Sequence, residues 1–426
     1  MALGRRSFLV GGAAMVAGGA VGLRSLFAAR RPHAPRATPF GPLVPDPRGL
    51  LDLPQGFSYR ILERAGDVMD DGYVVPARAD GMACFTLPDG QLALMRNHEI
   101  RGLVGGAYTG RPAPPEAYSP KHAGGVTRLV VDPKTFTRVS SNLVLTGTCI
   151  NCAGGPSPWG WLSCEETIES GHGYVFLCDV GAERVQPPRR VTSYGRFKHE
   201  AAAVDPATHI AYLTEDQGDS SFYRFVPTSK DTPFAGKLQA LAVVGKDRFA
   251  TGSAMRLHER VPIRWVDVDE FDPAQDSVRA QAQARGAAVF VRGEGVSFAN
   301  GTVYVGATAG GPVAGGQIFR VVPDGDGGTL ELFAQSEDPD VLDMPDNITV
   351  SPWGEVYMAE DPSGHPFLRG LTPTGELFDF ARNALSDSEF AGVSFAPDGR
   401  ALFVNIQDDG LTLAITGPFR AVSAAG

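Results

Sequence analysis

NCAGGPSPWGWLSCEE (residues 151–166) and DNITVSPWGEVYMAED (residues 346–361) repeat one pattern within a single chain. Each stretch begins with polar residues, contains the tight turn SPWG and ends with two acids. Alternating apolar residues flank the turn, which is typical of a β-hairpin whose glycine supplies a positive φ. Because the two ends of a hairpin lie side by side, the polar residues of each stretch are expected to meet at one rim.

Four other stretches have the same organisation, each around its own turn. They are DGMACFTLPDGQLALMRNHE (80–99), HEAAAVDPATHIAYLTED (199–216), EGVSFANGTVYVGAT (294–308) and EFAGVSFAPDGRALFVNIQ (389–407). Their spacing fits propeller blades of about 40–50 residues, provided that residues 101–125 and 228–290 are insertions. We therefore predict an all-β fold, a six-bladed β-propeller with loop insertions, which occupies residues 36–426 as a single domain. Two packed β-sandwiches are the alternative.

The N-terminus reads MALGRRSFLVGGAAMVAGGAVGLRSLFAA, in which Arg5 and Arg6 precede a mildly apolar, Gly-rich stretch. This pattern is typical of a twin-arginine signal peptide, to which we assign residues 1–35. A membrane anchor is the alternative, but Arg24 interrupts the apolar stretch. We expect export by the twin-arginine translocase to the periplasm or the exterior, without stable membrane association.

Charge and cysteine content restrict the remaining possibilities. The net charge of −10 gives no indication of nucleic-acid binding. Cys84, Cys164 and Cys178 lie in apolar strand patterns and are expected in the core. Cys149 and Cys152 form a C-I-N-C sequence that lacks the context of a thioredoxin motif or a structural zinc site, and a disulfide between two of the five remains possible. No long coiled coil or apolar edge is visible, so we expect a monomer.

The polar residues at the hairpin ends are expected to converge on the central channel. Such like charges need compensation, and carboxylate and amide oxygens suit Ca²⁺, whereas the Cys152 thiolate suits a transition metal such as iron. A single acid at a turn more often serves the turn, so the hypothesis depends on the shared position of the whole set. The set comprises Asn97, His98, Glu99, Cys152, Glu165, Glu166, Glu200, Glu215, Asp216, Glu294, Asp346, Asn347, Glu360, Asp361, Glu389 and Asn405.

With these motifs, the sequence resembles the PhoX-type alkaline phosphatase family. The resemblance covers residues 95–419, and its motifs are NCAGGPSPWGWLSCEE, HEAAAVDP, TEDQGDSSFYRFVP, PDNITVSPWGEVYMAED and FAGVSFAPDGRALFVNIQ. It implies an exported six-bladed propeller that hydrolyses phosphate monoesters with a cluster of ferric iron and calcium ions bridged by an oxo group. Cys149 lies outside the motif, and the chain looks short for the family, which puts the substrate range in doubt more than the chemistry.

Carried over to this chain, the resemblance implies that Cys152 ligates iron. The acids implied to share the iron and calcium ions are Glu165, Glu166, Glu200, Glu215, Asp216, Glu294, Asp346, Glu360 and Asp361. Three basic residues lie near proposed ligands and are candidates to grip the substrate phosphate: Lys198, Arg292 and Arg96.

Two other functions compete with a phosphatase. One is a calcium-dependent propeller hydrolase such as a lactonase or a phosphotriesterase-like enzyme, against which the thiol of Cys152 argues. The other is a non-catalytic secreted propeller in which calcium only stiffens the channel.

Overall fold

The computed structural model describes residues 38–108, 110–362 and 364–420, all within a compact unit of residues 36–426. The predicted twin-arginine signal, residues 1–35, lies outside the described residues. None of the described helices is long and apolar enough to cross a membrane.

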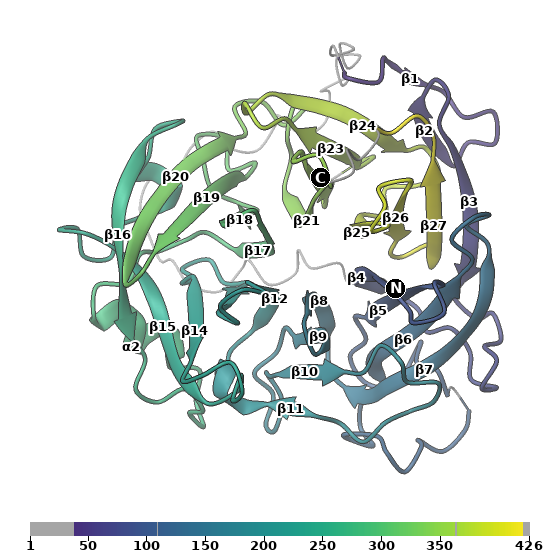
Figure 1. The fold of residues 1–426 in the computed structure, drawn as a ribbon, viewed down its shortest axis with the longest axis horizontal. Helices are drawn as coiled ribbons and strands as arrows, with labels where there is room; N and C mark the ends of the chain where they lie inside the picture. The colour runs from purple at the N-terminus through teal and green to yellow at the C-terminus, as the bar shows by residue number, and fades with distance from the viewer. Residues whose placement is uncertain (1–37, 109, 363, 421–426) are drawn as a thin grey trace, which may run out of the picture. The chain divides into compact units, whose positions relative to one another are not determined.

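The unit is an all-β, propeller-like arrangement of antiparallel sheets around a central axis (Figure 1). Three sheets have four strands each. They are β4 (Ala79–Thr86), β5 (Leu92–His98), β6 (Gly124–Val131) and β7 (Arg138–Thr148); β8 (Asn151–Ser157), β9 (Gly160–Glu165), β10 (Val175–Cys178) and β11 (Arg190–Val191); and β25 (Phe390–Phe395), β26 (Ala401–Ile406), β27 (Leu411–Thr416) and β3 (Ser58–Arg64).

Two larger sheets complete the ring. The six-stranded sheet contains β21 (Pro345–Val350), β22 (Val356–Glu360), β23 (Phe367–Leu371), β24 (Leu377–Asn383), β2 (Leu51–Pro54) and β1 (Leu43–Val44). The nine-stranded sheet contains β12 (His199–Val204), β13 (Ala211–Glu215), β14 (Tyr223–Pro227), β15 (Gly236–Val243), β16 (Arg260–Asp267), β20 (Gly327–Gln335), β19 (Gln317–Asp324), β18 (Thr302–Ala307) and β17 (Gly293–Ala299).

The described residues thus form five hydrogen-bonded sheets, whereas six separate blades were predicted. The reason is β16, which pairs with β15 on one side and with β20 on the other and so joins two meanders into one sheet. This strand lies inside the expected insertion 228–290, which also holds β15, α1 (Thr251–Ala254) and α2 (Val278–Ala284). The segment is therefore structured and is not a simple loop.

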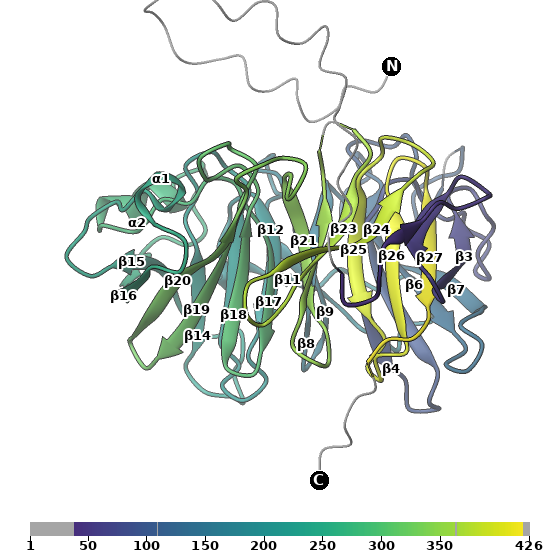
Figure 2. The same ribbon diagram turned by 90° about the horizontal axis from the view of Figure 1, so that it is seen from above.

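A strand from the N-terminal part of the chain and the last strand meet in one sheet. β3 pairs with β27 from Ser58–Thr416 to Arg64–Leu411. This pairing joins the beginning of the ring to its end. Figure 2 shows the strands from the side, where they run from one rim of the unit to the other.

The six predicted hairpins are confirmed as β4–β5, β8–β9, β12–β13, β17–β18, β21–β22 and β25–β26. The glycine of each SPWG turn has a positive φ, 136° at Gly160 and 91° at Gly354. In Figure 1 the first strand of each hairpin is the one nearest the axis. The hairpins therefore supply the inner wall of the ring.

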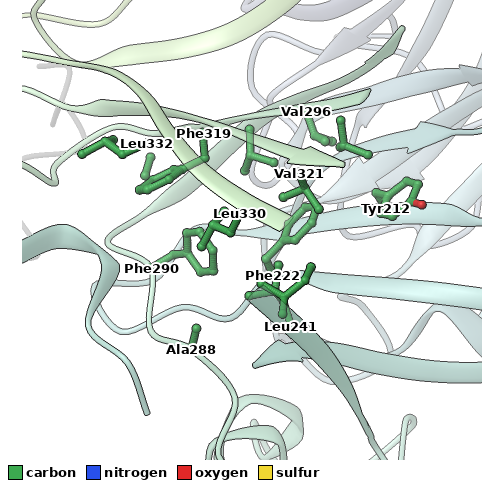
Figure 3. Packing of buried hydrophobic residues seen from close by; sticks show 14 of the residues in the cluster. Tyr212, Phe222, Leu241, Ala288, Phe290, Val296, Phe319, Val321, Leu330 and Leu332 are labelled. Carbon is green, nitrogen blue, oxygen red and sulfur yellow. The ribbon is translucent and has the colours of Figure 1, made fainter. Parts of the chain in front are cut away.

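Apolar side chains fill the spaces between neighbouring meanders of the ring, including the two that β16 joins into one sheet. Figure 3 shows one such region, in which Phe222 and Leu241 pack with Phe290, Phe319 and Leu330. Burial of this kind is the main source of stability for a fold whose sheets are otherwise independent.

The cysteines outside the C-I-N-C sequence behave as expected. Cys164 and Cys178 are buried in hydrophobic clusters, and Cys84 packs against another. Burial raises the pKa of these thiols, so they remain protonated near neutral pH. All five cysteines are free, so the possible disulfide is not formed.

Candidate metal centre

Every inner strand is interrupted at the same position by a β-bulge. In each hairpin, two consecutive residues of the inner strand lie opposite a single residue of the partner strand, and these residues are left out of the pairing. A bulge takes residues out of the ladder and re-aims their side chains, and bulges of this kind are common next to active sites. The first skipped residue of each strand is Asp80 in β4, Cys152 in β8, Glu200 in β12, Glu294 in β17, Asp346 in β21 and Gly392 in β25.

Five of these six side chains form one continuous cluster. The Cys152 Sγ lies 3.0 Å from Glu200 Oε1 and 3.7 Å from Asp80 Oδ2. One oxygen each of Glu200, Glu294 and Asp346 lies within 4.8 Å of the other two. Glu200 therefore belongs both to the thiol end of the cluster and to an all-oxygen end.

The sixth inner strand contributes no side chain, because Gly392 occupies the equivalent position with a φ of 63°. A Cβ there would lie 2.3 Å from the backbone oxygen of Asp80 and 2.7 Å from Asn405 Nδ2. Asn405 instead donates a hydrogen bond to the Asp80 carbonyl at 2.7 Å. This strand thus supports the ligand-bearing strand beside it.

A second group of possible ligands extends the thiol end toward the rim. Ligand atoms of Glu99, Cys152 and Glu166 all lie within 4.8 Å of one another. Glu99 directly follows β5 and Glu166 directly follows β9, so both come from strand ends. Cys152 is therefore shared between the inner cluster and the rim.

The ligands are confined to one end of the channel. A cavity of about 120 Å³ continues along the inner strands, and its lining begins one residue after each ligand position. Ala153, Ala201 and Gly295 are among the small residues that line it. The polar chemistry is therefore concentrated at the rim.

The chain turns sharply before most of these ligands. Arg78, Ile150, Arg292 and Met344 each lie two residues before a ligand and adopt φ values of 51°, 54°, 56° and 52°. Positive φ is uncommon for residues other than glycine and is strained for a β-branched residue such as Ile150. A residue with positive φ therefore precedes the bulge in four of the inner strands.

Among the described residues, the cluster combines several carboxylates with two arginines. Arg78 Nη2 lies 2.8 Å from Glu99 Oε2, and Arg292 Nη2 lies 2.8 Å from Glu294 Oε1. Buried carboxylates that lie this close remain ionised together only where positive charge compensates them. The arrangement therefore fits multivalent cations, with carboxylate oxygens for hard ions and one thiolate for a softer one.

Comparisons with known proteins decide the family. The sequence profile of the alkaline phosphatase PhoX family matches residues 38–410. The chain belongs to this family. The expected family assignment is thus confirmed, and the protein is an alkaline phosphatase, a hydrolase of phosphate monoesters.

The chain is similar to several solved structures. The structure of Pseudomonas fluorescens PhoX in complex with vanadate, a transition-state analogue, superimposes with a TM-score of 0.70 at 20% identity, covering 87% of this chain and 96% of that one. A Xanthomonas campestris gluconolactonase reaches a TM-score of 0.44 at 13% identity, covering 90% of this chain and 99% of that one. Among curated proteins, no sequence matches the chain.

Five predicted ligands lie outside all three groups of ligand atoms found among the described residues. Three of the five, Glu165, Glu215 and Glu360, each end the second strand of a hairpin and bind donors close to that strand. Glu165 accepts hydrogen bonds from His172 Nδ1 (2.7 Å) and from the amides of Cys149 and Gly173 (both 2.9 Å). The prediction that Glu165 faces the metals therefore has no support from this geometry.

Glu215 and Glu360 repeat this behaviour. Glu215 pairs with Arg279 and accepts from the Tyr223 hydroxyl at 2.9 Å, and burial raises its pKa to about 7. Glu360 lies 2.8 Å from Arg369 Nε and accepts from the Asp343 amide at 2.9 Å. Burial also raises the pKa of Glu360. Their carboxylates are already engaged by donors of their own sheets.

Glu165, Glu215 and Glu360 are each followed in the sequence by a second acid, which lies just beyond the end of the strand. Glu166 reaches the group with Cys152, as described above. Asp216 instead forms a two-point ion pair with Arg292, at 2.8 Å to Nε and 3.0 Å to Nη2. Asp361 is half-buried after β22 and joins none of the three groups.

The three predicted phosphate-gripping residues differ in accessibility. Arg96 is fully buried in β5, where it pairs with Glu63 and donates to Thr412 Oγ1 at 2.7 Å, so the geometry gives no support to a contact with substrate. Arg292 is half-buried beside Glu294. Lys198 is half-buried two residues before Glu200, and no carboxylate among the described residues lies within ion-pair distance of it.

Sequence reasoning missed two members of the site. Asp80 was overlooked although it opens its repeat in phase with Cys152, Glu200 and Glu294, a signal that aligning the repeats would have revealed. Arg78 was overlooked although it lies two residues before Asp80, the position that Arg292 occupies before Glu294. Lys198 has the same offset from Glu200, so three cations share one position in the repeat.

Proposed function

We propose that the phosphatase works with ferric iron and calcium held at this end of the channel. Glu99, Cys152 and Glu166 would hold iron, because a thiolate among carboxylates suits a transition metal better than calcium. Glu200, Glu294 and Asp346 would hold calcium, because they offer only oxygen ligands. The observation that carries this proposal is the convergence of side chains from five inner strands, with Cys152 Sγ 3.0 Å from Glu200 Oε1.

Asp80 and Glu200 would connect the two kinds of ion. Both have carboxylate oxygens next to the Cys152 sulfur, and Glu200 also belongs to the all-oxygen group. When bound, the ions supply Lewis-acid stabilisation of phosphoryl charge and an activated nucleophile near neutral pH.

The chain's own cations would bind and orient the phosphate. Arg78, Lys198 and Arg292 precede ligands on three different inner strands by two residues, so they surround one mouth of the cluster. Asp216 fixes the guanidinium of Arg292 with two hydrogen bonds, which keeps its donors in a defined direction. Lys198, which has no carboxylate partner among the described residues, has its ammonium group available for a phosphate oxygen.

Several wider features belong to the same proposal. We count the nine-stranded sheet as two blades joined through β16, so that each of the six inner hairpins belongs to its own blade. We also propose twin-arginine export of residues 36–426 to the periplasm or the exterior as a monomer, with Arg5 and Arg6 as the export signal.

Metal analysis tests the proposal. The protein is purified without chelator, its iron and calcium are measured, and hydrolysis of p-nitrophenyl phosphate is assayed before and after EDTA treatment. We expect both metals in the active protein, loss of activity with EDTA and recovery when the ions are restored. Activity that survives complete metal removal, or active protein without iron, would contradict the assignment.

Vanadate gives a second readout. It is described as a transition-state analogue for Pseudomonas fluorescens PhoX. We expect vanadate to inhibit this enzyme in competition with the substrate, and we expect Lys198→Met to weaken that inhibition.

A further inference from the structure

A separate group of metal-type ligands lies outside the central cluster. Ligand atoms of His122, Cys149 and Glu169 all lie within 4.8 Å of one another. None of these residues was assigned to the iron and calcium ions, and Cys149 stands outside the motif that carries the family resemblance. We propose that these three residues form an additional site for a divalent transition metal of the zinc type.

The three ligands come from segments that are distant in sequence. His122 lies in the long connection between β5 and β6, Cys149 directly follows β7, and Glu169 lies between β9 and β10. An ion bound here would tie the 101–123 connection to two neighbouring sheets. The site would therefore fix segments that no strand pairing joins.

The backbone directs the two neighbouring cysteines to different groups. Ile150, between them, has a φ of 54°, which turns the chain sharply. The matching acids show the same separation, since Glu166 groups with Cys152 while Glu169, three residues later, groups with Cys149. The C-I-N-C sequence thus supplies one thiol to each of two sites and does not form a single site.

The donor set favours a zinc-type ion over calcium. One thiolate, one imidazole and one carboxylate are ligands typical of Zn²⁺, whereas Ca²⁺ prefers oxygen alone. A thiolate and a carboxylate balance the charge of a divalent ion, which matters because Cys149 is fully buried and His122 nearly so. The fourth position of a tetrahedral ion would be left for water.

The spacing is compatible with one ion. His122 Nε2 lies 3.4 Å from Glu169 Oε2. Two ligands that are each about 2.0 Å from a tetrahedral ion are separated by about 3.3 Å. Binding through Nε2 places the imidazole proton on Nδ1, so the long 3.3 Å contact from the Gly102 amide to Nδ1 would be lost.

Neighbouring residues hold the ligands in place. The Tyr108 hydroxyl donates to the His122 carbonyl at 2.7 Å, and Glu165 accepts from the Cys149 amide at 2.9 Å. Arg101 Nε lies 3.5 Å from Glu169 Oε1, so in the metal-free protein it offsets part of the Glu169 charge. Glu165, which the central cluster does not use, thereby gains a role in positioning Cys149.

Zinc titration of matched variants tests this inference. Metal-depleted full-length protein is loaded with Zn²⁺, dialysed and analysed for zinc, iron and calcium. We expect Cys149→Ser and Glu169→Gln each to lose about one zinc per chain relative to the wild type. The core-thiol variant Cys178→Ser should retain it. Equal zinc in the wild type, Cys149→Ser and Glu169→Gln would overturn the site.

Cobalt gives a spectroscopic readout that separates the two thiols. In a Cys152→Ser background, Co²⁺ should produce a thiolate-to-metal charge-transfer band that disappears when Cys149 is also replaced by Ser. No band in the Cys152→Ser background would contradict the inference. Glu169→Gln is the safer variant for folding because Glu169 is only half-buried. Iron and calcium measured in the same samples report on the central cluster independently.

Discussion

The hairpins β12–β13 and β21–β22 each carry acids at both ends, and the acids at the two ends make different contacts. At the start of the first strand, Glu200 and Asp346 are displaced by bulges and meet side chains from other sheets. At the end of the second strand, Glu215 and Glu360 stay in the ladder and bind donors of their own sheets. In these two hairpins, position relative to the bulge, rather than charge, therefore separates candidate ligands from structural acids.

The largest expected effect follows from replacing an acid at a bulge. Glu200→Gln should lower kcat for p-nitrophenyl phosphate by roughly 100-fold or more, since even outer-shell metal partners cost 10–100-fold when removed. Metal content should fall with it, while the fold persists because the substitution relieves charge repulsion in the metal-free chain. Steady-state kinetics with metal analysis measure both, with exposed Glu376→Gln as the control. Unchanged kcat and metal content would place Glu200 outside the site.

An acid at a strand end should behave in the opposite way. Glu360→Gln removes one of the two carboxylates that pair with the buried Arg369, the other being Asp379, so we expect a loss of about 2 kcal/mol in the free energy of unfolding. Iron and calcium per folded chain should not change. Denaturant unfolding and metal analysis measure the two effects. A variant with full stability but reduced metal would reverse the distinction drawn above.

Replacing Lys198 should affect the hydrolysis of substrate more than the stability of the protein. Lys198→Met should lower kcat/KM by roughly 10-fold to 100-fold, because one donor to a charged phosphoryl group is lost. Stability and metal content should stay at wild-type levels. Exposed Lys230→Met is the matched control. Wild-type kcat/KM in the Lys198 variant would leave Arg78 and Arg292 as the phosphate-binding cations.

The smallest effect concerns the backbone before Cys152. Ile150 adopts a left-handed conformation that asparagine tolerates better than a β-branched residue. Ile150→Asn should therefore raise the free energy of unfolding by about 1 kcal/mol, provided that the turn is retained. Denaturant unfolding measures the change, with iron content as a check on the turn. A clear loss of stability would show that the side chain contributes more than the strain costs.

The sequence was sufficient to predict the hairpins and the rim, because turn residues and strand alternation are local signals. β16 was not predicted, because it belongs to no repeat and forms only through pairing with β15 and β20. Pairing between distant segments leaves little trace in either sequence alone.

The site was partly predictable for a similar reason. The shared position of Cys152, Glu200, Glu294 and Asp346 within the sequence repeats identified them as candidate ligands. The β-bulge that turns these side chains out of the strand was not visible in the sequence, and Asp80 was not included among the candidates. Consecutive acids such as Glu165 and Glu166 were treated alike, although successive side chains in a strand point to opposite faces.

Strand alternation also bears on the prediction for Arg96, which the geometry does not support. Arg96 pairs with Met82 on the far side of the bulge and is enclosed among Glu63, Thr127 and Thr412. Arg96 was proposed because it lies near Glu99 in the sequence, but that proximity does not determine on which face of the strand the Arg96 side chain lies.

Anomalous diffraction from crystals of the metal-loaded enzyme tests the central claim most directly. We predict an iron peak at bonding distance, about 2.3 Å, from the Cys152 sulfur. Calcium should lie among the oxygens of Glu200, Glu294 and Asp346. Iron bound away from Cys152, or ions held by Glu165, Glu215 or Glu360 instead, would contradict the account.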